Sequence, residues 1–271
     1  MKKVIVVIPV HKPDPTPNEL ASFEQCFKVL GSHPITIVAP SGLDMSAYSE
    51  KVPGCSVTFI DPHWMSDIRQ YNKLKISKYF YSLFKDYEYL LTYELDAWVF
   101  RDELIYWCDK GYDYIGAPWF EKYGLACSEK HLIGGNSGFS LRKIYKSIDI
   151  LKRVGIITRI RRIWFDSKLQ GLFPLFNIPI FLKVFNVKST KYFNEIIFNW
   201  SEENEDYYWS YFIQLTFTDF VVAPYNDAFK FSFETNSLFL YFENENKLPF
   251  GCHAWEKYEP EFWKKYIRID G

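Results

Sequence analysis

Two carboxylates, Glu94 and Asp96, follow directly after an apolar run that is typical of a strand. The run contains Leu90, Leu91 and Tyr93 and reads as a strand buried on both faces. Residues two apart in an extended chain point to the same side. Two like charges side by side are costly unless a cation or a proton is shared between them. The pair therefore predicts a divalent ion whose remaining positions are filled by phosphate oxygens and water, and the alternative is an acidic surface turn.

Three further segments could take part in chemistry. Four acids lie within residues 202–206, just before the aromatic Tyr207–Trp209, and they either supply a carboxylate or form a solvated helix start. His253 lies beside a glycine near the C-terminus, where its ring is either free or a satisfied core side chain. The glycine-rich stretch 134–142 predicts a hairpin or bulge, or a close approach of the backbone to a ligand. It is not a phosphate loop, because Gly-Lys-Ser/Thr is absent.

The elements that must position these residues alternate between strands and helices. Strands are predicted at Val4–Val10, Ile35–Val38, Val57–Ile60, around Leu90, at Tyr112–Ala117 and at Phe139–Leu141. Helices are predicted after the capping box at Thr16, ending at Gly31, and at Asn72–Tyr87 and Leu104–Cys108. This order predicts an α/β fold with a mostly parallel sheet flanked by helices. In such folds ligands bind at the carboxyl ends of the strands, which is where the acid pair lies.

Length and composition fit one large globular domain. The chain has 271 residues, of which 48% are hydrophobic and 20% aromatic, so a sizeable core is available. The net charge of −1 argues against nucleic acid as a partner. The five cysteines are scattered, without a Cys-x-x-Cys pair, as expected of ordinary thiols in a reducing compartment. With neither a signal peptide nor a membrane span in the sequence, we expect a cytoplasmic protein.

The stretch 141–200 differs from the rest in charge. It holds twelve Lys or Arg against three Asp or Glu, a net of +9, whereas the remainder carries −10. Arg159, Arg161 and Arg162 stand beside apolar and aromatic residues, and the apolar Leu172–Leu182 follows. We interpret residues 143–200, approximately, as an insertion that could dock on the inner face of a membrane. A basic helix packed on an otherwise acidic domain explains the pattern equally well.

Taken together, these segments resemble a known family. The chain is similar to bacterial glycosyltransferases of the GT-A fold, and in particular to the DUF5672 group. The resemblance covers nearly the whole chain in order, apart from the basic stretch, and its motifs are weak singly but fairly specific as a set. The residues that carry it are 7–12, 70–74, 93–97, 113–119, 135–142, 204–206 and 249–255.

The resemblance implies a nucleotide-sugar donor, usually a UDP-sugar, bound through Mn²⁺ or Mg²⁺. Asp96 and His253 would bind the metal, with Glu94 as a helper that contacts ribose or reaches the metal through water. This departs from the usual Asp at the first position. The donor would also contact Pro9, Val10, His11, Tyr71, Asn72, Lys73 and Asn136. Asp206 would be the general base, with Glu205 shaping the acceptor pocket. The acceptor would be a glycan or a lipid-linked sugar, as in bacterial surface polysaccharide synthesis.

Residues 1–100 would form the nucleotide-sugar half of the single domain 1–271, and 101–271 the acceptor-side half. Trp119, Trp209 and Trp255 could stack on sugar rings, although such side chains are more often core. Two other classes remain open. A sugar-nucleotide nucleotidyltransferase would normally have a basic glycine-rich loop after the first strand, where this chain has Pro9–Pro13. A non-catalytic carbohydrate-binding protein would explain the aromatics but not the strand-end acids.

Overall fold

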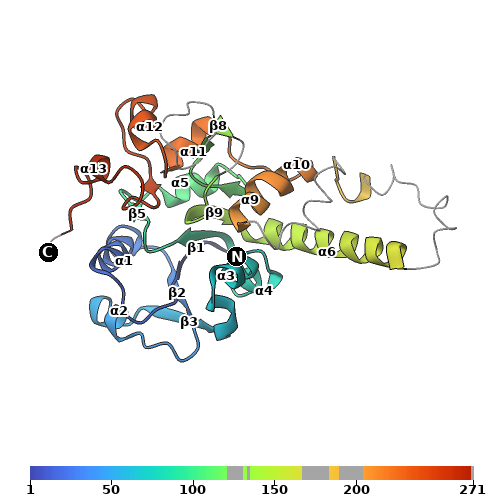
Figure 1. The fold of residues 1–271 in the computed structure, drawn as a ribbon, viewed down its shortest axis with the longest axis horizontal. Coiled ribbons are helices and arrows are strands. Elements are labelled where there is room, and N and C mark those ends of the chain that lie inside the picture. Colours follow the sequence, from blue (N-terminus) through green and yellow to red (C-terminus); the bar gives the residue numbers. More distant parts are fainter. Residues whose placement is uncertain (121–130, 133–134, 167–182, 189–203, 270–271) are drawn as a thin grey trace.

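A computed structural model of the chain shows an α/β protein built on a central sheet (Figure 1). For residues 131–132 and 160–166 only the backbone is described. The described residues are 1–120, 131–132, 135–166, 183–188 and 204–269.

The central sheet has six strands, and most pairs of neighbouring strands run parallel. In spatial order the strands are β3 (Ser56–Ile60), β2 (Ile35–Pro40), β1 (Lys2–Pro9), β4 (Tyr87–Tyr93), β9 (Phe139–Lys143) and β6 (Tyr114–Ile115). The first four are mutually parallel, and β9 runs antiparallel to both β4 and β6. The expected α/β class is confirmed, with β9 as the antiparallel exception. Because β1 and β4 are parallel neighbours, their carboxyl ends meet at one edge of the sheet.

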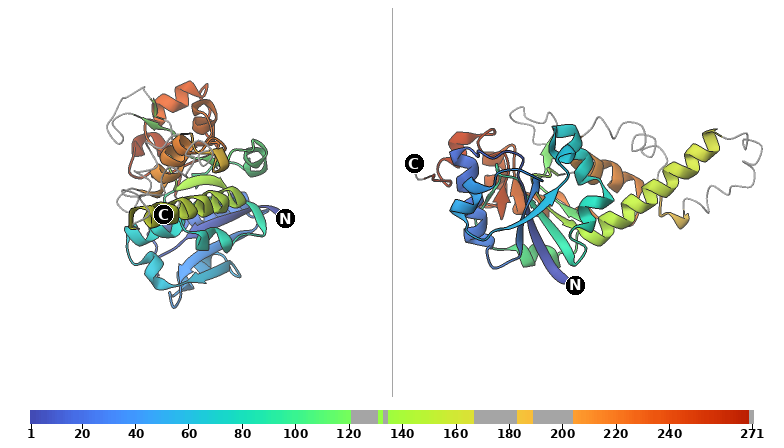
Figure 2. Two further views of the ribbon diagram at one scale, coloured as in Figure 1. Left: turned by 90° about the vertical axis from the view of Figure 1, so that its right-hand side faces the viewer. Right: turned by 90° about the horizontal axis from the view of Figure 1, so that it is seen from below.

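Helices cover both faces of the sheet (Figure 2). Val4, Val6 and Ile8 of β1 belong to the core cluster that includes residues of α1 (Pro17–Leu30) and α5 (Leu104–Asp109). The intervening Ile5 and Val7 belong to the cluster on the other side, with α4 (Lys78–Ser82) and α6 (Ile144–Asp166). Alternate side chains of β1 thus pack into two hydrophobic cores, one on each face of the sheet. This is why the strand is a continuous apolar run in the sequence.

Smaller elements complete the two halves of the chain. Near the N-terminal strands lie α2 (Ser46–Lys51), the 3₁₀ turn η1 (Pro62–Met65) and α3 (Ile68–Lys75). A helical run consists of α9 (Glu205–Tyr207), the π-helical η3 (Tyr208–Ile213) and α10 (Gln214–Thr216). A short sheet has the order β10 (Ser232–Phe233), β11 (Gly251–Cys252) and β5 (Trp98–Val99), and β7 (Trp119–Phe120) pairs with β8 (His131–Leu132). The last helices are α11 (Tyr225–Phe231), α12 (Ser237–Glu243) and α13 (Pro260–Trp263).

Two local predictions had opposite outcomes. The capping box is confirmed: Thr16 Oγ1 accepts from the Glu19 N–H at 3.2 Å, and the Glu19 carboxylate accepts from the Thr16 N–H at 2.7 Å. The single helix at Asn72–Tyr87 is wrong. The chain forms α3 and α4 instead, because Ser77 adopts an extended conformation and its hydroxyl accepts from the Phe80 N–H, which starts a new helix.

Helix α6 extends beyond the body of the domain like an arm (Figures 1 and 2). Its base is anchored by Asp219, whose carboxylate accepts from Lys146 Nζ at 2.8 Å and from Arg153 at 2.9 and 3.0 Å. Within the described part of the chain, no helix is both long and apolar enough to cross a membrane. Leu172–Leu182, the apolar half of the expected insertion, lies outside the described residues.

Candidate metal and donor site

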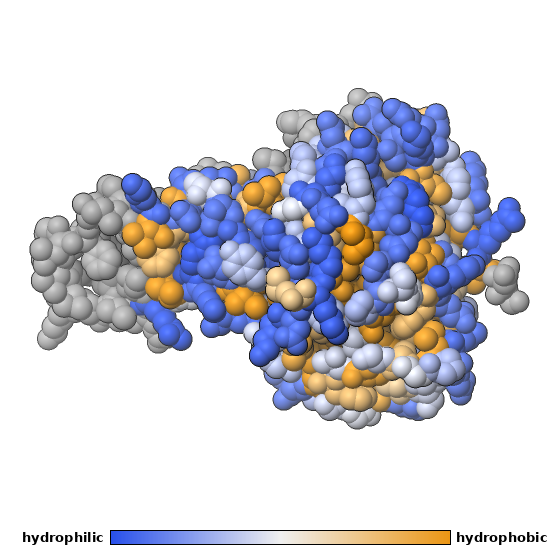
Figure 3. Space-filling view, turned by 180° about the vertical axis from the view of Figure 1, so that it is seen from behind, coloured by the Kyte–Doolittle hydropathy of each residue, from blue (hydrophilic) through white to orange (hydrophobic). Residues whose placement is uncertain are grey.

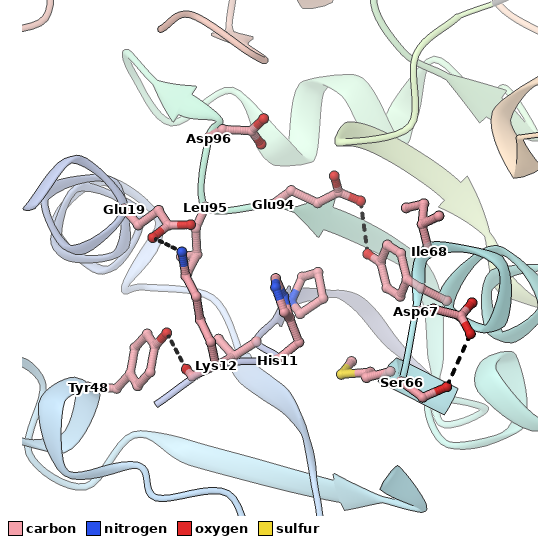
Figure 4. Close-up of a pocket in the computed structure, with 14 residues that line it drawn as sticks. His11, Lys12, Glu19, Tyr48, Ser66, Asp67, Ile68, Glu94, Leu95 and Asp96 are labelled. Carbon is pink, nitrogen blue, oxygen red and sulfur yellow. Dashed lines mark hydrogen bonds and ion pairs between the residues drawn. The ribbon is translucent and has the colours of Figure 1, made fainter. Parts of the chain in front are cut away.

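Glu94 and Asp96 lie immediately after β4, as the sequence predicts, but a turn rather than an extended chain brings them together. The Ala97 N–H donates to the Glu94 carbonyl oxygen at 2.8 Å, which closes the turn. Leu95 is 8% exposed and belongs to the core cluster, so the middle residue of the turn points away from the two acids (Figure 4). Glu94 and Asp96 therefore point to the same side, as expected. The cause is a turn, however, and not an extended strand.

His253 reaches the acid pair through the short sheet. β5 begins two residues after Asp96, and β11 ends just before His253. The two strands pair antiparallel with Cys252 opposite Trp98, which brings His253 beside the turn. The remote C-terminal histidine is thus fixed by backbone pairing.

The side chains of these three residues form a group that could hold a cation. One ligand atom from each of Glu94, Asp96 and His253 lies within 4.8 Å of the others. His253 Nε2 is 3.0 Å from Asp96 Oδ1 and 3.6 Å from Glu94 Oε2, and it is buried without the alignment of a hydrogen bond. Two carboxylates and one imidazole suit Mn²⁺, and the oxygens suit Mg²⁺. A buried nitrogen that faces two carboxylates is an arrangement that could bind a cation.

Opposite charges in the group attract one another. Burial opposes the charged imidazole, but the carboxylates of Asp96, Glu234 and Glu94 outweigh it and raise the pKa of His253 well above its ordinary value. Burial likewise opposes the Glu94 carboxylate, whereas Lys75 and His253 hold its pKa well below the usual range. The imidazolium thus takes the place of a cation between the acids, and a metal ion would displace its proton.

The glycine-rich segment makes room for His253. A side-chain methyl group on Gly138 would overlap the His253 ring, and one on Gly116 would overlap the Asn136 carbonyl. The Gly138 carbonyl accepts from the Glu94 N–H at 2.8 Å, which fixes the segment against the acid pair. The close approach that the structure shows at Gly138 is to the histidine ring, and the expected approach to a ligand stays a prediction.

Replacing Gly138 with alanine should therefore displace His253 and weaken Mn²⁺ binding. The shifts needed to relieve the overlap should lower the free energy of unfolding by about 1–3 kcal/mol, which is the usual cost of overpacking. Titration calorimetry with Mn²⁺ and thermal unfolding measure the two effects. Gly155→Ala is the matched control, because its added methyl group meets nothing within 4 Å in α6. Unchanged Mn²⁺ affinity in Gly138→Ala would contradict this role of the glycine.

A cavity of about 540 Å³ opens beside the acid pair, at the carboxyl ends of β1 and β4 (Figure 4). One wall contains an ion pair in which Lys12 Nζ lies 2.8 Å from Glu19, and Tyr48 donates to the Lys12 carbonyl at 3.1 Å. The lining residues are Pro9, Val10, His11, Lys12, Glu19, Tyr48, Met65, Ser66, Asp67, Ile68, Tyr71, Glu94, Leu95 and Asp96. The cavity thus combines apolar side chains with charged ones, and Glu94 and Asp96 form one part of its lining.

Behind the acid pair lies a buried ionic network. Lys75 is 1% exposed, and its ammonium is 2.8 Å from Glu94 Oε1, 2.6 Å from Glu205 Oε1 and 3.0 Å from Ser137 Oγ. Arg142 donates to both oxygens of Glu205, at 3.0 and 3.1 Å. Burial opposes the ionised Glu205, but Arg142 and Lys75 outweigh it and lower its pKa. Glu205 is therefore a fixed anion whose two oxygens are both occupied by cations.

The neighbouring acid, Asp206, is in the opposite condition. It is 8% exposed, and its Oδ1 accepts from the Tyr207 N–H at 2.8 Å. Burial and the charge of Glu205 raise the pKa of Asp206 to about 7, with Glu234 adding to the rise and Lys75 opposing it. Such a pKa suits a group that takes up a proton near neutral pH.

The structure brings most of the sequence-predicted site residues to one place. Pro9, Val10, His11 and Tyr71 line the cavity with Glu94 and Asp96. Three other expected donor contacts do not line it. Asn72 donates to the Asn204 side chain at 3.3 Å, Lys73 lies on the same helix, and Asn136 is buried behind His253. Glu202 and Glu203 lie outside the described residues.

Two sequence interpretations need correction. Trp209 is fully buried and donates to the Lys75 carbonyl at 3.2 Å, so it cannot stack on a sugar. His253 is 8% exposed, and its ring is not free, since Nδ1 lies 3.1 Å from Glu234 Oε1. Trp119 and Trp255 are 8% and 7% exposed, which favours the core alternative.

Sequence reasoning missed Lys75, Arg142 and Glu234, which hold the site from behind. Each is 1% exposed or less. A buried ion needs a partner, but that partner lies 63 residues away for Arg142 and Glu205. The one available signal was the presence of charged residues inside apolar periodic segments.

The fold and the three-ligand group define an α/β protein with a candidate cation site at the carboxyl edge of its sheet. A model of the family described as "Protein of unknown function (DUF5672)" matches residues 54–253, and the chain belongs to this family. No curated protein matches the chain.

Several solved structures are distantly similar. Mouse xyloside xylosyltransferase 1, apo form, has 10% identity and a TM-score of 0.49 over 93% of this chain and 97% of its own. A glycosyltransferase involved in the glycosylation of the major capsid of PBCV-1 has 10% identity and a TM-score of 0.45 over 94% and 97%. Core-mannan synthase A from Aspergillus fumigatus, Mn/GDP-form, has 12% identity and a TM-score of 0.35 over 45% and 43%. At such scores these likenesses carry no weight in assigning a function.

Proposed function

We propose that this protein is a metal-dependent, GT-A-like glycosyltransferase that moves a sugar from a nucleotide-sugar, in particular a UDP-sugar, to a glycan or lipid-linked acceptor. The observation that carries the proposal is the convergence of Glu94, Asp96 and His253 at the end of the 540 Å³ cavity. A cation held by these residues would lie where a diphosphate would lie if a nucleoside filled the cavity. Surface polysaccharide synthesis in bacteria is the setting that we propose for the reaction.

Asp96, His253 and Glu94 would hold Mn²⁺ or Mg²⁺, which, when bound, would neutralise the charge that develops on the diphosphate leaving group. Glu94 would use one oxygen only, because its Oε1 already accepts from Tyr71 at 2.9 Å and from Lys75 at 2.8 Å. Pro9, Val10 and His11 would flank the base, and Tyr71 would stand near the ribose or diphosphate. We place Asn72, Lys73 and Asn136 outside direct donor contact.

Asp206 would take the proton from the acceptor hydroxyl, and Glu205 would hold the start of α9 in place. The raised pKa of Asp206 supports the base role, because a carboxylate that binds a proton near pH 7 is a stronger base than an exposed one. Glu205 is unsuited to that role, since Arg142 and Lys75 occupy both its oxygens. We assign Glu205 to the acceptor side as a support for Asp206.

A screen of nucleotide-sugars with and without Mn²⁺ tests the proposal. Thermal unfolding should shift upward only when the matching donor and Mn²⁺ are both present, because a ligand that binds only the folded state stabilises it. The matching donor should then be hydrolysed slowly to a nucleoside diphosphate in the absence of acceptor. Pyrophosphate release would instead indicate a nucleotidyltransferase. Sugar binding without metal dependence or turnover would indicate a carbohydrate-binding protein.

We further propose that the arm formed by α6 contacts an anionic membrane. Tyr145 and Ile156 on α6 are 63% and 46% exposed, and Lys152 and Arg159 are exposed beside them. Hydrophobic and hydrophilic surface is mixed along this arm (Figure 3). Basic and apolar groups together are what an interfacial helix requires.

Changing Arg159, Arg161 and Arg162 to glutamate should abolish flotation with vesicles that contain anionic lipid at low salt. The physical reason is loss of attraction to lipid headgroups, roughly 1 kcal/mol per basic residue near the surface. Flotation of wild-type and variant protein with neutral and anionic vesicles measures the effect.

The matched control changes three exposed lysines elsewhere, Lys28, Lys85 and Lys265, to glutamate. This control should still float, because it has the same net charge as the arginine variant. If the wild-type protein does not bind anionic vesicles, or if the arginine variant binds them as well as the lysine control does, the arm is a basic helix with no membrane role.

A further inference from the structure

Glu234 lies behind His253, away from the cavity. It follows β10, it is 1% exposed, and it is absent from the cavity lining. Its Oε1 is 3.1 Å from His253 Nδ1 and accepts from Asn136 Nδ2 at 2.8 Å. Glu234 therefore contacts the ring nitrogen opposite the one that faces Glu94 and Asp96.

The orientation of this contact is fixed by the glycine-rich segment. The Gly138 N–H donates to Asn136 Oδ1 at 2.8 Å, so the amide oxygen of Asn136 faces the backbone and its NH₂ faces Glu234. Glu234 Oε1 is then an acceptor for both neighbours, and His253 Nδ1 must carry a proton to share this atom. In the neutral ring the lone pair is therefore on Nε2, which points at the two acids.

We propose that Glu234 is a positioning residue of the cation site: with Asn136 and the Gly138 backbone, it holds the His253 ring so that Nε2 faces the metal. The inference rests on the proposed function. A carboxylate bonded to the far nitrogen of a ligating histidine fixes the tautomer, resists rotation of the ring and makes the other nitrogen a better donor. All three effects act in the direction of tighter metal binding.

The competing explanation is that Glu234 only stabilises the fold as a buried polar side chain. The two explanations differ in what depends on His253. A positioning residue acts on the metal through the imidazole, so its removal has no further effect once the imidazole is gone. A stabilising or purely electrostatic residue acts in either background.

Measurements of Mn²⁺ affinity distinguish these two explanations. The affinity is measured by calorimetry and by the electron paramagnetic resonance signal of free Mn²⁺. Glu234→Ala should weaken Mn²⁺ binding by about 10–100-fold, the range usual for such partners, and Glu234→Gln, which can still accept, by less. In a His253→Ala background, Glu234→Ala should change the affinity little. Asp113→Ala is the matched control: Asp113 is also buried, accepts from the Val221 N–H at 2.9 Å, and precedes β6 at the far end of the sheet.

Nitrogen-15 resonances of His253 in the Mg²⁺-loaded wild-type protein test the inference without any variant. We expect a proton on Nδ1 and none on Nε2, and a proton on Nε2 would overturn the inference. The inference would also be overturned if Glu234→Ala bound Mn²⁺ with wild-type affinity. It would equally be overturned if Glu234→Ala lowered the Mn²⁺ affinity by the same factor in the wild-type and His253→Ala backgrounds. A wild-type protein that binds neither Mn²⁺ nor Mg²⁺ would refute the proposed function itself, which is a different result.

Discussion

Replacing Asp96 with alanine should abolish Mn²⁺-dependent binding of a nucleoside diphosphate while leaving the fold intact. The side chain of Asp96 is 45% exposed and lies 3.0 Å from His253 Nε2, so its removal takes away a metal ligand and little packing. We expect Mn²⁺ affinity to fall by more than about 100-fold, beyond the usual cost of losing a partner of a ligand. Calorimetry with Mn²⁺ and UDP, added separately and together, measures the loss.

Asp86→Ala is the control for this experiment. Asp86 is an exposed aspartate that immediately precedes β4, so it lies at the opposite end of the same strand. Its variant should bind Mn²⁺ and nucleotide like the wild type. If Asp96→Ala retains Mn²⁺-dependent affinity for the nucleotide, the strand-end acids do not form the donor site.

Changing Asp206 to asparagine should retain donor binding yet lower transfer by about 10²-fold or more, as expected when a general base is lost. With the pKa of Asp206 raised to about 7, the wild-type carboxylate is protonated below that pH and available as a base above it. The wild-type rate should therefore rise with pH through about 7. The residual activity of Asp206→Asn should lack this dependence, which steady-state kinetics at several pH values will show.

Stability distinguishes the two neighbouring acids. Because the folded pKa of Asp206 lies above the ordinary 3.8, its contribution to stability is present at low pH and is lost as pH rises through about 7. Asp206→Asn should thus unfold at or above the wild-type temperature at pH 8. Glu205→Gln should be destabilised by about 3–5 kcal/mol, because it leaves Arg142 and Lys75 underpaired. Near-normal turnover in Asp206→Asn would show that Asp206 is not the base and would leave Glu203 as the next candidate.

What could be predicted from the sequence was mostly local. The apolar run of β1 and the capping box at Thr16 are patterns whose physical cause lies within a few residues, and both are confirmed. The acid pair was found for the same reason, since charges at the end of a buried strand stand out. The α3–α4 boundary was missed because the apolar periodicity continues across Ser77, and only its hydroxyl cap marks the break.

What could not be predicted depends on contacts between distant segments. Nothing near His253 in the chain indicates that Glu234 and Asn136 stand behind its ring. Similarly, α3 gives no sign that the buried Lys75 would join Glu94 to Glu205. Pairing a buried charge with its partner requires the sheet order, and the placement of antiparallel β9 beside β4 could not be read from strand and helix alternation.

The Lys75 network has a consequence for attempts to split this protein or to exchange its segments. A cut near residue 100 would keep the Lys75–Glu94 pair on one fragment and the Arg142–Glu205 pair on the other, but it would break the buried 2.6 Å ion pair between Lys75 and Glu205. It would also strip β9 from β4 and open the sheet. We therefore expect residues 1–100 and 101–271 to unfold as one cooperative unit and not to behave as interchangeable modules. A hybrid built to combine one donor preference with another acceptor preference would have to inherit these four residues together.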